Sequence, residues 1–133
     1  MRHLDGVSFL AGKIGAACRE ADLRYEIVYQ AKDEGYYAAH ITVFPDFEVP
    51  AMNWDTLAIR GGVEIQVTTE VQDLIARLLH RHYERRRSQP TVPGEMWQWD
   101  YASEEFATNY LGHILHYVEG MIVELREGRS GRN

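Results

Sequence analysis

Two histidines and a glutamate stand three residues apart in the chain, at His113, His116 and Glu119. In a helix, residues three apart lie side by side on one face. Imidazole nitrogens and carboxylate oxygens are common ligands of divalent metals such as zinc. A further ligand would have to come from another segment, such as His40 or Asp100, and the HExxH pattern of metal-binding helices is absent. We therefore expect no metal and no other cofactor, and interpret the three residues as a polar outer face or as part of a subunit contact.

An aromatic segment supplies a second set of candidates. Trp97, Trp99 and Tyr101 alternate with polar residues, so in an extended segment they share one face. Aromatic walls with a few polar groups line small-molecule pockets and also protein interfaces. With His40 and His116 as the polar groups, these five residues form the candidate ligand-binding set. The alternative is that the rings pack into the core, since tryptophan is mostly buried on average.

Charge and composition argue against several classes of function. Twenty acidic residues outnumber 14 basic ones, and the net charge of −6 disfavours binding to nucleic acid or to an anionic membrane. No Walker, GxGxxG, GxSxG or CxxC pattern is present, so whether the protein is an enzyme stays open. The single cysteine, Cys18, excludes an internal disulfide, as expected of a cytoplasmic protein. No apolar run approaches the ~20 residues of a membrane-spanning helix.

Strands are predicted in the first half of the chain. Apolar and polar residues alternate over residues 24–67, which is the period of half-buried strands. One hairpin should turn at residues 33–35, and Gly61-Gly62 suits the two-residue turn of a second hairpin over 57–67. A helix over residues 6–22 precedes them, and the aromatic segment after residue 95 offers a fifth strand.

Two further helices are predicted, over residues 70–87 and 103–127. Thr69 opens the first with a capping-box pattern, and Ser103 caps the second. The element order α-ββ-ββ-α-(β)-α predicts a two-layer α+β fold, with helices packed on one face of an antiparallel sheet of four to five strands. We expect residues 1–133 to form a single domain, with a disordered tail at 128–133.

The last predicted helix has two different faces. Its apolar stripe predicts the core, so Ile114, like Leu78 on the preceding helix, should be fully buried. The opposite arc carries Gly112, His116 and Gly120, and glycine inside a helix lets another backbone approach closely. We interpret this arc as the interface of a homodimer, and the protein as a non-enzymatic binding or protein-interaction module. The alternative is a small-molecule-binding α+β domain with an aromatic-lined cavity, which could be an enzyme.

Overall fold

The computed structural model of the chain describes residues 1–52, 55–86 and 97–130. The described residues form three α-helices and two antiparallel sheets, which make an α+β fold. The sheets are smaller than predicted, since one has three strands in the order β1-β2-β5 and the other has the two strands β3-β4. The prediction of a single sheet of four to five strands was therefore wrong, although the α+β class and the antiparallel pairing are confirmed.

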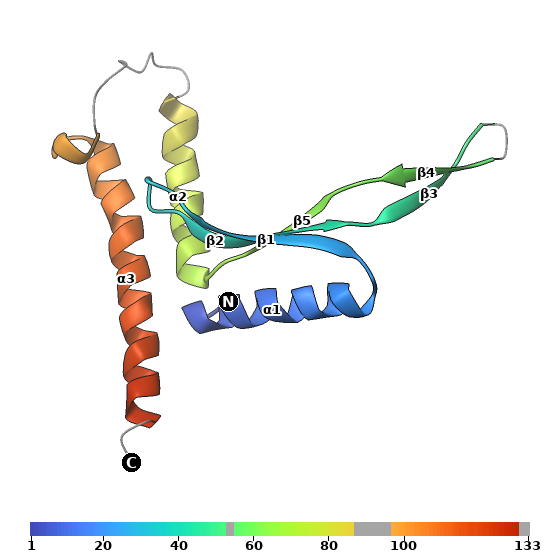
Figure 1. Cartoon of the computed structure of the whole chain (residues 1–133). Coiled ribbons are helices and arrows are strands. Elements are labelled where there is room, and N and C mark those ends of the chain that lie inside the picture. The colour runs from blue at the N-terminus through green and yellow to red at the C-terminus, as the bar shows by residue number, and fades with distance from the viewer. Residues whose placement is uncertain (53–54, 87–96, 131–133) are drawn as a thin grey trace.

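The strands form one short and one long hairpin. In the first, β1 (Arg24–Ala31) pairs with β2 (Tyr37–Phe44) around a turn in which Gly35 has a φ of 81°. In the second, β2 continues into β3 (Asp46–Pro50), and β4 (Thr56–Arg60) continues into β5 (Val63–Val67). The register is unbroken. β3 and β4 project away from the helices as an arm, by which we mean residues 46–52 and 55–60 (Figure 1).

The predicted hairpin at Gly61-Gly62 was wrong. Val43 pairs with Val63 and, three residues further, Asp46 pairs with Arg60, so both glycines lie within the long hairpin rather than at its turn. Gly61 donates a backbone hydrogen bond to the carbonyl oxygen of Pro45, 3.3 Å away. Proline has no N–H of its own, which accounts for the gap between β2 and β3 at this point. The chain reverses further on, where the N–H of Ala51 donates to the carbonyl of Asp55.

Helix α1 (Leu4–Glu20) covers one face of the three-stranded sheet. Its buried residues recur at helical spacing and meet the inward side chains of the strands. Gly15 allows this close approach, because a Cβ there would lie only 3.0 Å from the Tyr25 ring. The small core is formed by Val7, Ala11, Cys18, Ala39, Ile41, Val43 and Val67.

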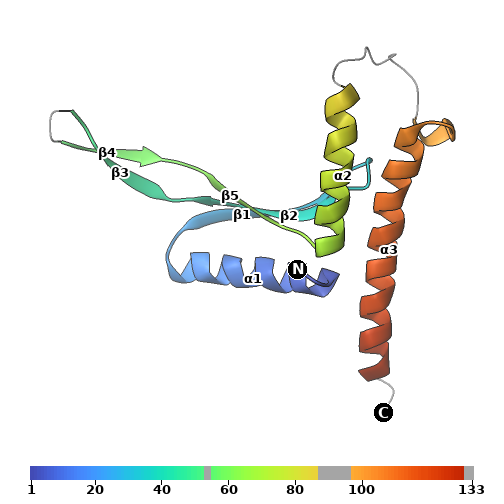
Figure 2. The ribbon, with the colours of Figure 1, turned by 180° about the vertical axis from the view of Figure 1, so that it is seen from behind.

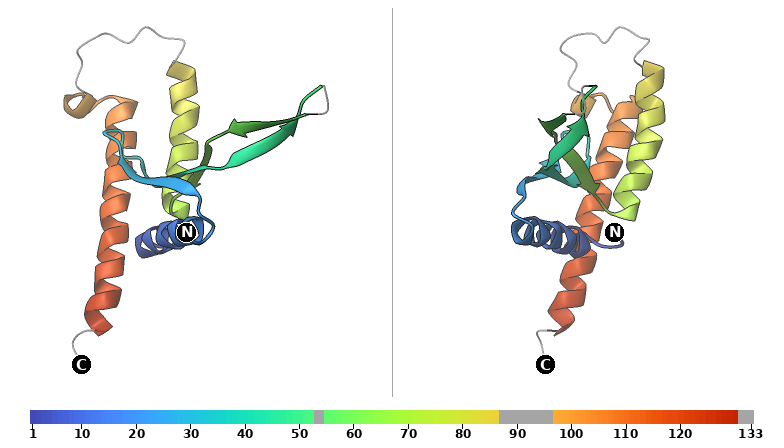
Figure 3. Two further views of the ribbon diagram at one scale, coloured as in Figure 1. Left: turned by 45° about the vertical axis from the view of Figure 1, so that its right-hand side comes forward. Right: turned by 90° about the vertical axis from the view of Figure 1, so that its right-hand side faces the viewer.

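The other two helices pack on each other. α2 (Glu70–Arg86) and α3 (Glu104–Ser130) lie side by side at the end of the sheet away from the arm (Figures 2 and 3). We had predicted that they cover a face of the sheet, but α1 does this instead. The predicted tail from residue 128 is helical as far as Ser130. None of the helices in the described part of the chain is long and apolar enough to cross a membrane.

Both predicted helix caps are confirmed. The hydroxyl of Thr69 accepts a hydrogen bond from the Gln72 N–H at 3.1 Å, and the hydroxyl of Ser103 accepts one from the Phe106 N–H at 3.1 Å. Each satisfies a backbone donor that the first turn of a helix leaves without a partner. The helix starts could be read from the sequence because this interaction spans only three residues.

Candidate functional site

The inner face of α3 is the arc of glycines and histidines, and it packs against its own chain. Gly112 meets the turn between β1 and β2, where a Cβ on Gly112 would lie 3.0 Å from the Cα of Gly35. The carbonyl of Gly112 also accepts a hydrogen bond from the buried side chain of Gln72. A Cβ on Gly120 would lie 3.9 Å from Leu4 Cδ1 of α1, which is an ordinary van der Waals contact. Gly112, predicted to admit a second subunit, therefore admits the chain's own turn, and Gly120 faces the chain's own first helix.

The two histidines of the inner face contact a tyrosine at the start of β2. The Tyr37 hydroxyl lies 2.7 Å from His113 Nδ1, and His113 Nε2 lies 2.8 Å from the carbonyl oxygen of Asp33. A neutral His113 that donates from Nε2 and accepts at Nδ1 satisfies both contacts. His116 stacks on the same Tyr37 ring, with centroids 3.6 Å apart and planes within 1°. Both ring nitrogens of His113 are thus engaged by the protein.

A carboxylate is buried on the same face. Glu119 is 7% exposed, and neither of its carboxylate oxygens has a hydrogen-bond partner among the described residues. The buried Nδ1 of His116 also lacks one. Burial lowers the pKa of His116 below its usual value, the negative charge of Glu119 raises it, and His113 lowers it. In the described part of the chain, no three His, Cys, Asp or Glu side chains are grouped so that they could hold a metal ion.

A groove of about 300 Å³ opens beside the stacked pair. Tyr37 and His116 line it together with residues of α1 and β1, and its walls are mostly apolar. Of the five residues in the predicted ligand-binding set, His116 is the one that lines this groove. His40 lies on the opposite face of β2 from Tyr37, because side chains alternate along a strand. There it contacts Glu64 at 3.3 Å and the Tyr36 hydroxyl at 3.4 Å.

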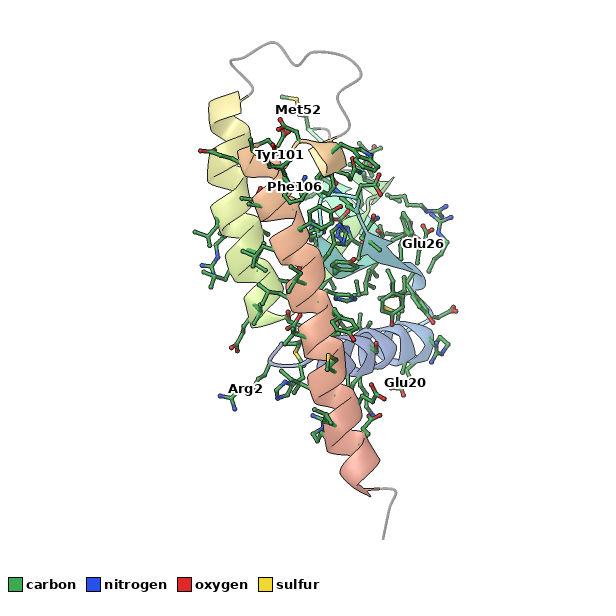
Figure 4. All side chains as sticks on the ribbon, turned by 90° about the vertical axis from the view of Figure 1, so that its left-hand side faces the viewer. Arg2, Glu20, Glu26, Met52, Tyr101 and Phe106 are labelled. Carbon is green, nitrogen blue, oxygen red and sulfur yellow. The ribbon has the colours of Figure 1, made fainter. Side chains whose placement is uncertain are left out.

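The aromatic segment forms no wall. Trp97 and Trp99 lie in η1 (Trp97–Trp99), a short 3-10 helix rather than the predicted strand. Trp97 packs its edge on Tyr110 at 5.2 Å, which fixes the turn against α3, whereas Trp99 is 81% exposed and Tyr101 is 84% exposed. Tyr101 lies at the N-terminal end of α3, as Figure 4 shows. Alternation over so few residues could not distinguish a strand from this turn.

The outer face of α3 is the apolar stripe, and it is exposed. Ile114, expected in the core, is 55% exposed, and Leu78 on α2 is 49% exposed, so both burial predictions were wrong. The side chains on this face are each between 40% and 69% exposed. We call them the outer stripe: Leu111, Ile114, Tyr117, Val118, Met121, Ile122 and Leu125.

A second exposed apolar surface lies on the arm. Phe47 pairs with Ile59, and Val49 pairs with Leu57, so the four side chains share one face of the two-stranded sheet. Each is more than two-fifths exposed. We call these four residues the arm face. The sequence had indicated strands here, but not that the strands would leave the body of the molecule.

Comparison of the chain with protein-family models, with curated proteins and with solved structures finds no match. Functional inference therefore rests on the geometry of these surfaces.

Proposed function

We propose that the protein is a non-enzymatic protein-interaction module that acts as a homodimer, with the outer stripe of α3 in the contact. The observation that carries this proposal is the exposure of seven large apolar side chains on one helix face. Monomeric proteins rarely leave a contiguous apolar patch of more than about 300–600 Å² open to water. A second chain that covers the stripe would remove its apolar area from water, which is the main driving force of association.

The total surface of the chain supports self-association. The accessible surface is 10464 Å² for a mass of 15.4 kDa. A compact monomer of this mass would expose about 7,200 Å². The excess is several times the ~800 Å² that each partner buries in a standard interface. An open shape with a protruding arm and a helix covered on one side is typical of a subunit whose remaining surface is buried by another copy.

The proposed contact differs from the one expected from the sequence. Gly112, His116 and Gly120 are engaged by Gly35, Tyr37 and Leu4 of the same chain. The dimer remains a prediction, and its contact moves to the opposite side of α3.

Sedimentation equilibrium of the wild-type chain and of Tyr117→Glu tests the proposal. Tyr117 is 69% exposed in the single chain, so a glutamate there leaves the fold intact but places a charge in the dimer contact. We expect a dimer at micromolar concentration for the wild type and a monomer for the variant. Phe9→Glu is the matched control, because Phe9 is 65% exposed on α1 and lies outside the stripe. A monomeric wild type, or equal loss of the dimer in both variants, would contradict the proposal.

Small-molecule binding is the second candidate, and the groove beside His116 favours it. The buried Nδ1 of His116 lacks a partner in the described residues, and the surrounding walls are mostly apolar. A ligand with a largely apolar body would fit these walls. A rise in melting temperature with a small metabolite, absent in His116→Ala, would favour this function over a purely interactive one.

A further inference from the structure

The arm needs a surface to pack on. An isolated two-stranded hairpin is marginally stable in water, and it becomes stable when a hydrophobic face packs against another element. In the described part of the chain, β3 and β4 make their main contacts with each other. Among the described residues, no third strand pairs with the backbone groups along the two outer edges of the arm.

The arm face continues the core face of the molecule. Ile41 and Val43 of β2 point toward α1, and by alternation Phe47 and Val49 lie on the same side of the extended strand. Within the body of the protein, this side is covered by α1. Beyond the end of α1 the same apolar side is exposed. The arm face therefore has the composition of a core surface but lacks its covering layer.

The outer stripe is suited to cover it. From Leu111 to Leu125 the stripe extends over ~21 Å of helix, at 1.5 Å per residue. From Asp46 to Pro50, β3 extends over ~14 Å, at 3.4 Å per residue. The arm points away from α3 of its own chain, at the opposite end of the sheet (Figures 1 and 2). Both surfaces are apolar and the outer stripe is long enough to receive the arm face, yet one chain cannot bring them together.

The geometry points to a reciprocal exchange in which the arm face of each chain packs on the outer stripe of a second copy. A two-fold axis between the chains brings the arm of each over α3 of the other, so both contacts form at once and the assembly closes. This inference rests on the proposed function, since it names the surface that meets the stripe in the dimer. It accounts for both exposed apolar surfaces with a single partner.

Cross-linking between two variants that each carry one introduced cysteine tests the exchange. Chains that carry Val49→Cys are mixed with chains that carry Tyr117→Cys, and a short bismaleimide is added. We expect a covalent dimer in the mixture and little in either variant alone. The wild-type chain is the control, because its one cysteine, Cys18, is buried. Cross-linking of Tyr117→Cys with itself alone would mean that the two stripes meet each other, which overturns the exchange but leaves the proposed dimer standing.

Two lysine substitutions on neighbouring residues of β3 give a second measurement. Val49 lies on the arm face, whereas Glu48 lies on the other side of the same strand. We expect Val49→Lys to raise the dimer dissociation constant at least about tenfold and Glu48→Lys to leave it nearly unchanged. Equal dissociation constants in the two variants would overturn the exchange. An open polymer of the wild type in sedimentation would overturn the closed two-fold arrangement, and a monomer would overturn both proposals.

Discussion

The two faces of α3 differ in a way that reverses the usual relation between polarity and burial. The inner face carries glycines, two histidines and the 7%-exposed Glu119, and it packs against the β1–β2 turn and α1. The outer face carries large aliphatic and aromatic side chains, and it is open. The inner face is held by close backbone approach and by specific polar contacts, which depend on fit. The outer face offers apolar area, which is the kind of surface that another chain covers.

Among substitutions on α3, Gly112→Ala on the inner face should change the free energy of unfolding most. In Gly112→Ala the new Cβ would lie 2.9 Å from the carbonyl carbon of Gly35 and closer still to its oxygen, and these backbone atoms cannot move aside cheaply. Overpacking typically costs about 1–3 kcal/mol, and contact with backbone puts this site in the upper part of that range, above the gain of about 1 kcal/mol in helix propensity. We expect the free energy of unfolding to fall by about 1–2 kcal/mol. Urea denaturation measures this change.

Gly120→Ala is the control for that substitution. The nearest atom to a Cβ at Gly120 is Leu4 Cδ1 at 3.9 Å, an ordinary van der Waals contact. Alanine should therefore stabilise the chain there, by up to about 1 kcal/mol. If both alanines stabilise the protein, the close approach of Gly112 to Gly35 is not a feature of the folded state.

These faces show what the sequence could and could not establish. Helical periodicity separated the apolar stripe from the glycine arc correctly, and the local caps at Thr69 and Ser103 were predicted. Periodicity does not say which face turns inward, because that depends on long-range partners such as the β1–β2 turn. The glycines carried the relevant signal, since close approach to backbone was inferred for Gly112 but assigned to a second subunit.

The arm shows the same limit in the sheet. The alternation of residues predicted strands on both sides of Gly61-Gly62, and strands are present there. A glycine pair is a good hairpin turn locally, but the observed register pairs Val43 with Val63 and places the reversal near Ala51. Pairing over the full length of the hairpin forms more ladder than a turn at the glycines would. Only the sum of these non-local pairs decides the register.

A smaller effect is expected for Ile114→Ala on the outer face. Ile114 is 55% exposed in the single chain, so its truncation should cost the monomer about 1 kcal/mol or less. At protein concentrations where a second chain covers the outer stripe, the cost of Ile114→Ala should be larger, because the side chain is then buried.

Ile41→Ala is the comparison. Ile41 is fully buried within its own chain, so this substitution should lower the free energy of unfolding by about 2–5 kcal/mol at any protein concentration. Denaturant midpoints at two protein concentrations check both. A concentration-independent cost for Ile114→Ala would mean that the outer stripe meets no second chain.

The smallest effect concerns the pH dependence of the inner face. Burial against Tyr37 lowers the pKa of His116 below its usual 6.5, although Glu119 opposes the shift. A histidine with a lower pKa in the folded state binds its proton more readily in the unfolded state, so protonation favours unfolding. The contribution of His116 to stability is therefore fully present above pH 6.5 and is lost as the pH falls through 6.5 toward the folded-state pKa. Because His116 faces its own chain, the pH should change the free energy of unfolding rather than the dimer dissociation constant.

Urea denaturation of the wild type and of His116→Gln between about pH 7.5 and pH 5.5 isolates this contribution from that of the other histidines. We expect the wild type to lose more stability than the variant over this range. Parallel pH profiles for the two proteins would contradict the burial of His116 against its own chain. A dimer that dissociates in acid for the wild type but not for His116→Gln would place His116 in the subunit contact and reverse the assignment of the two faces.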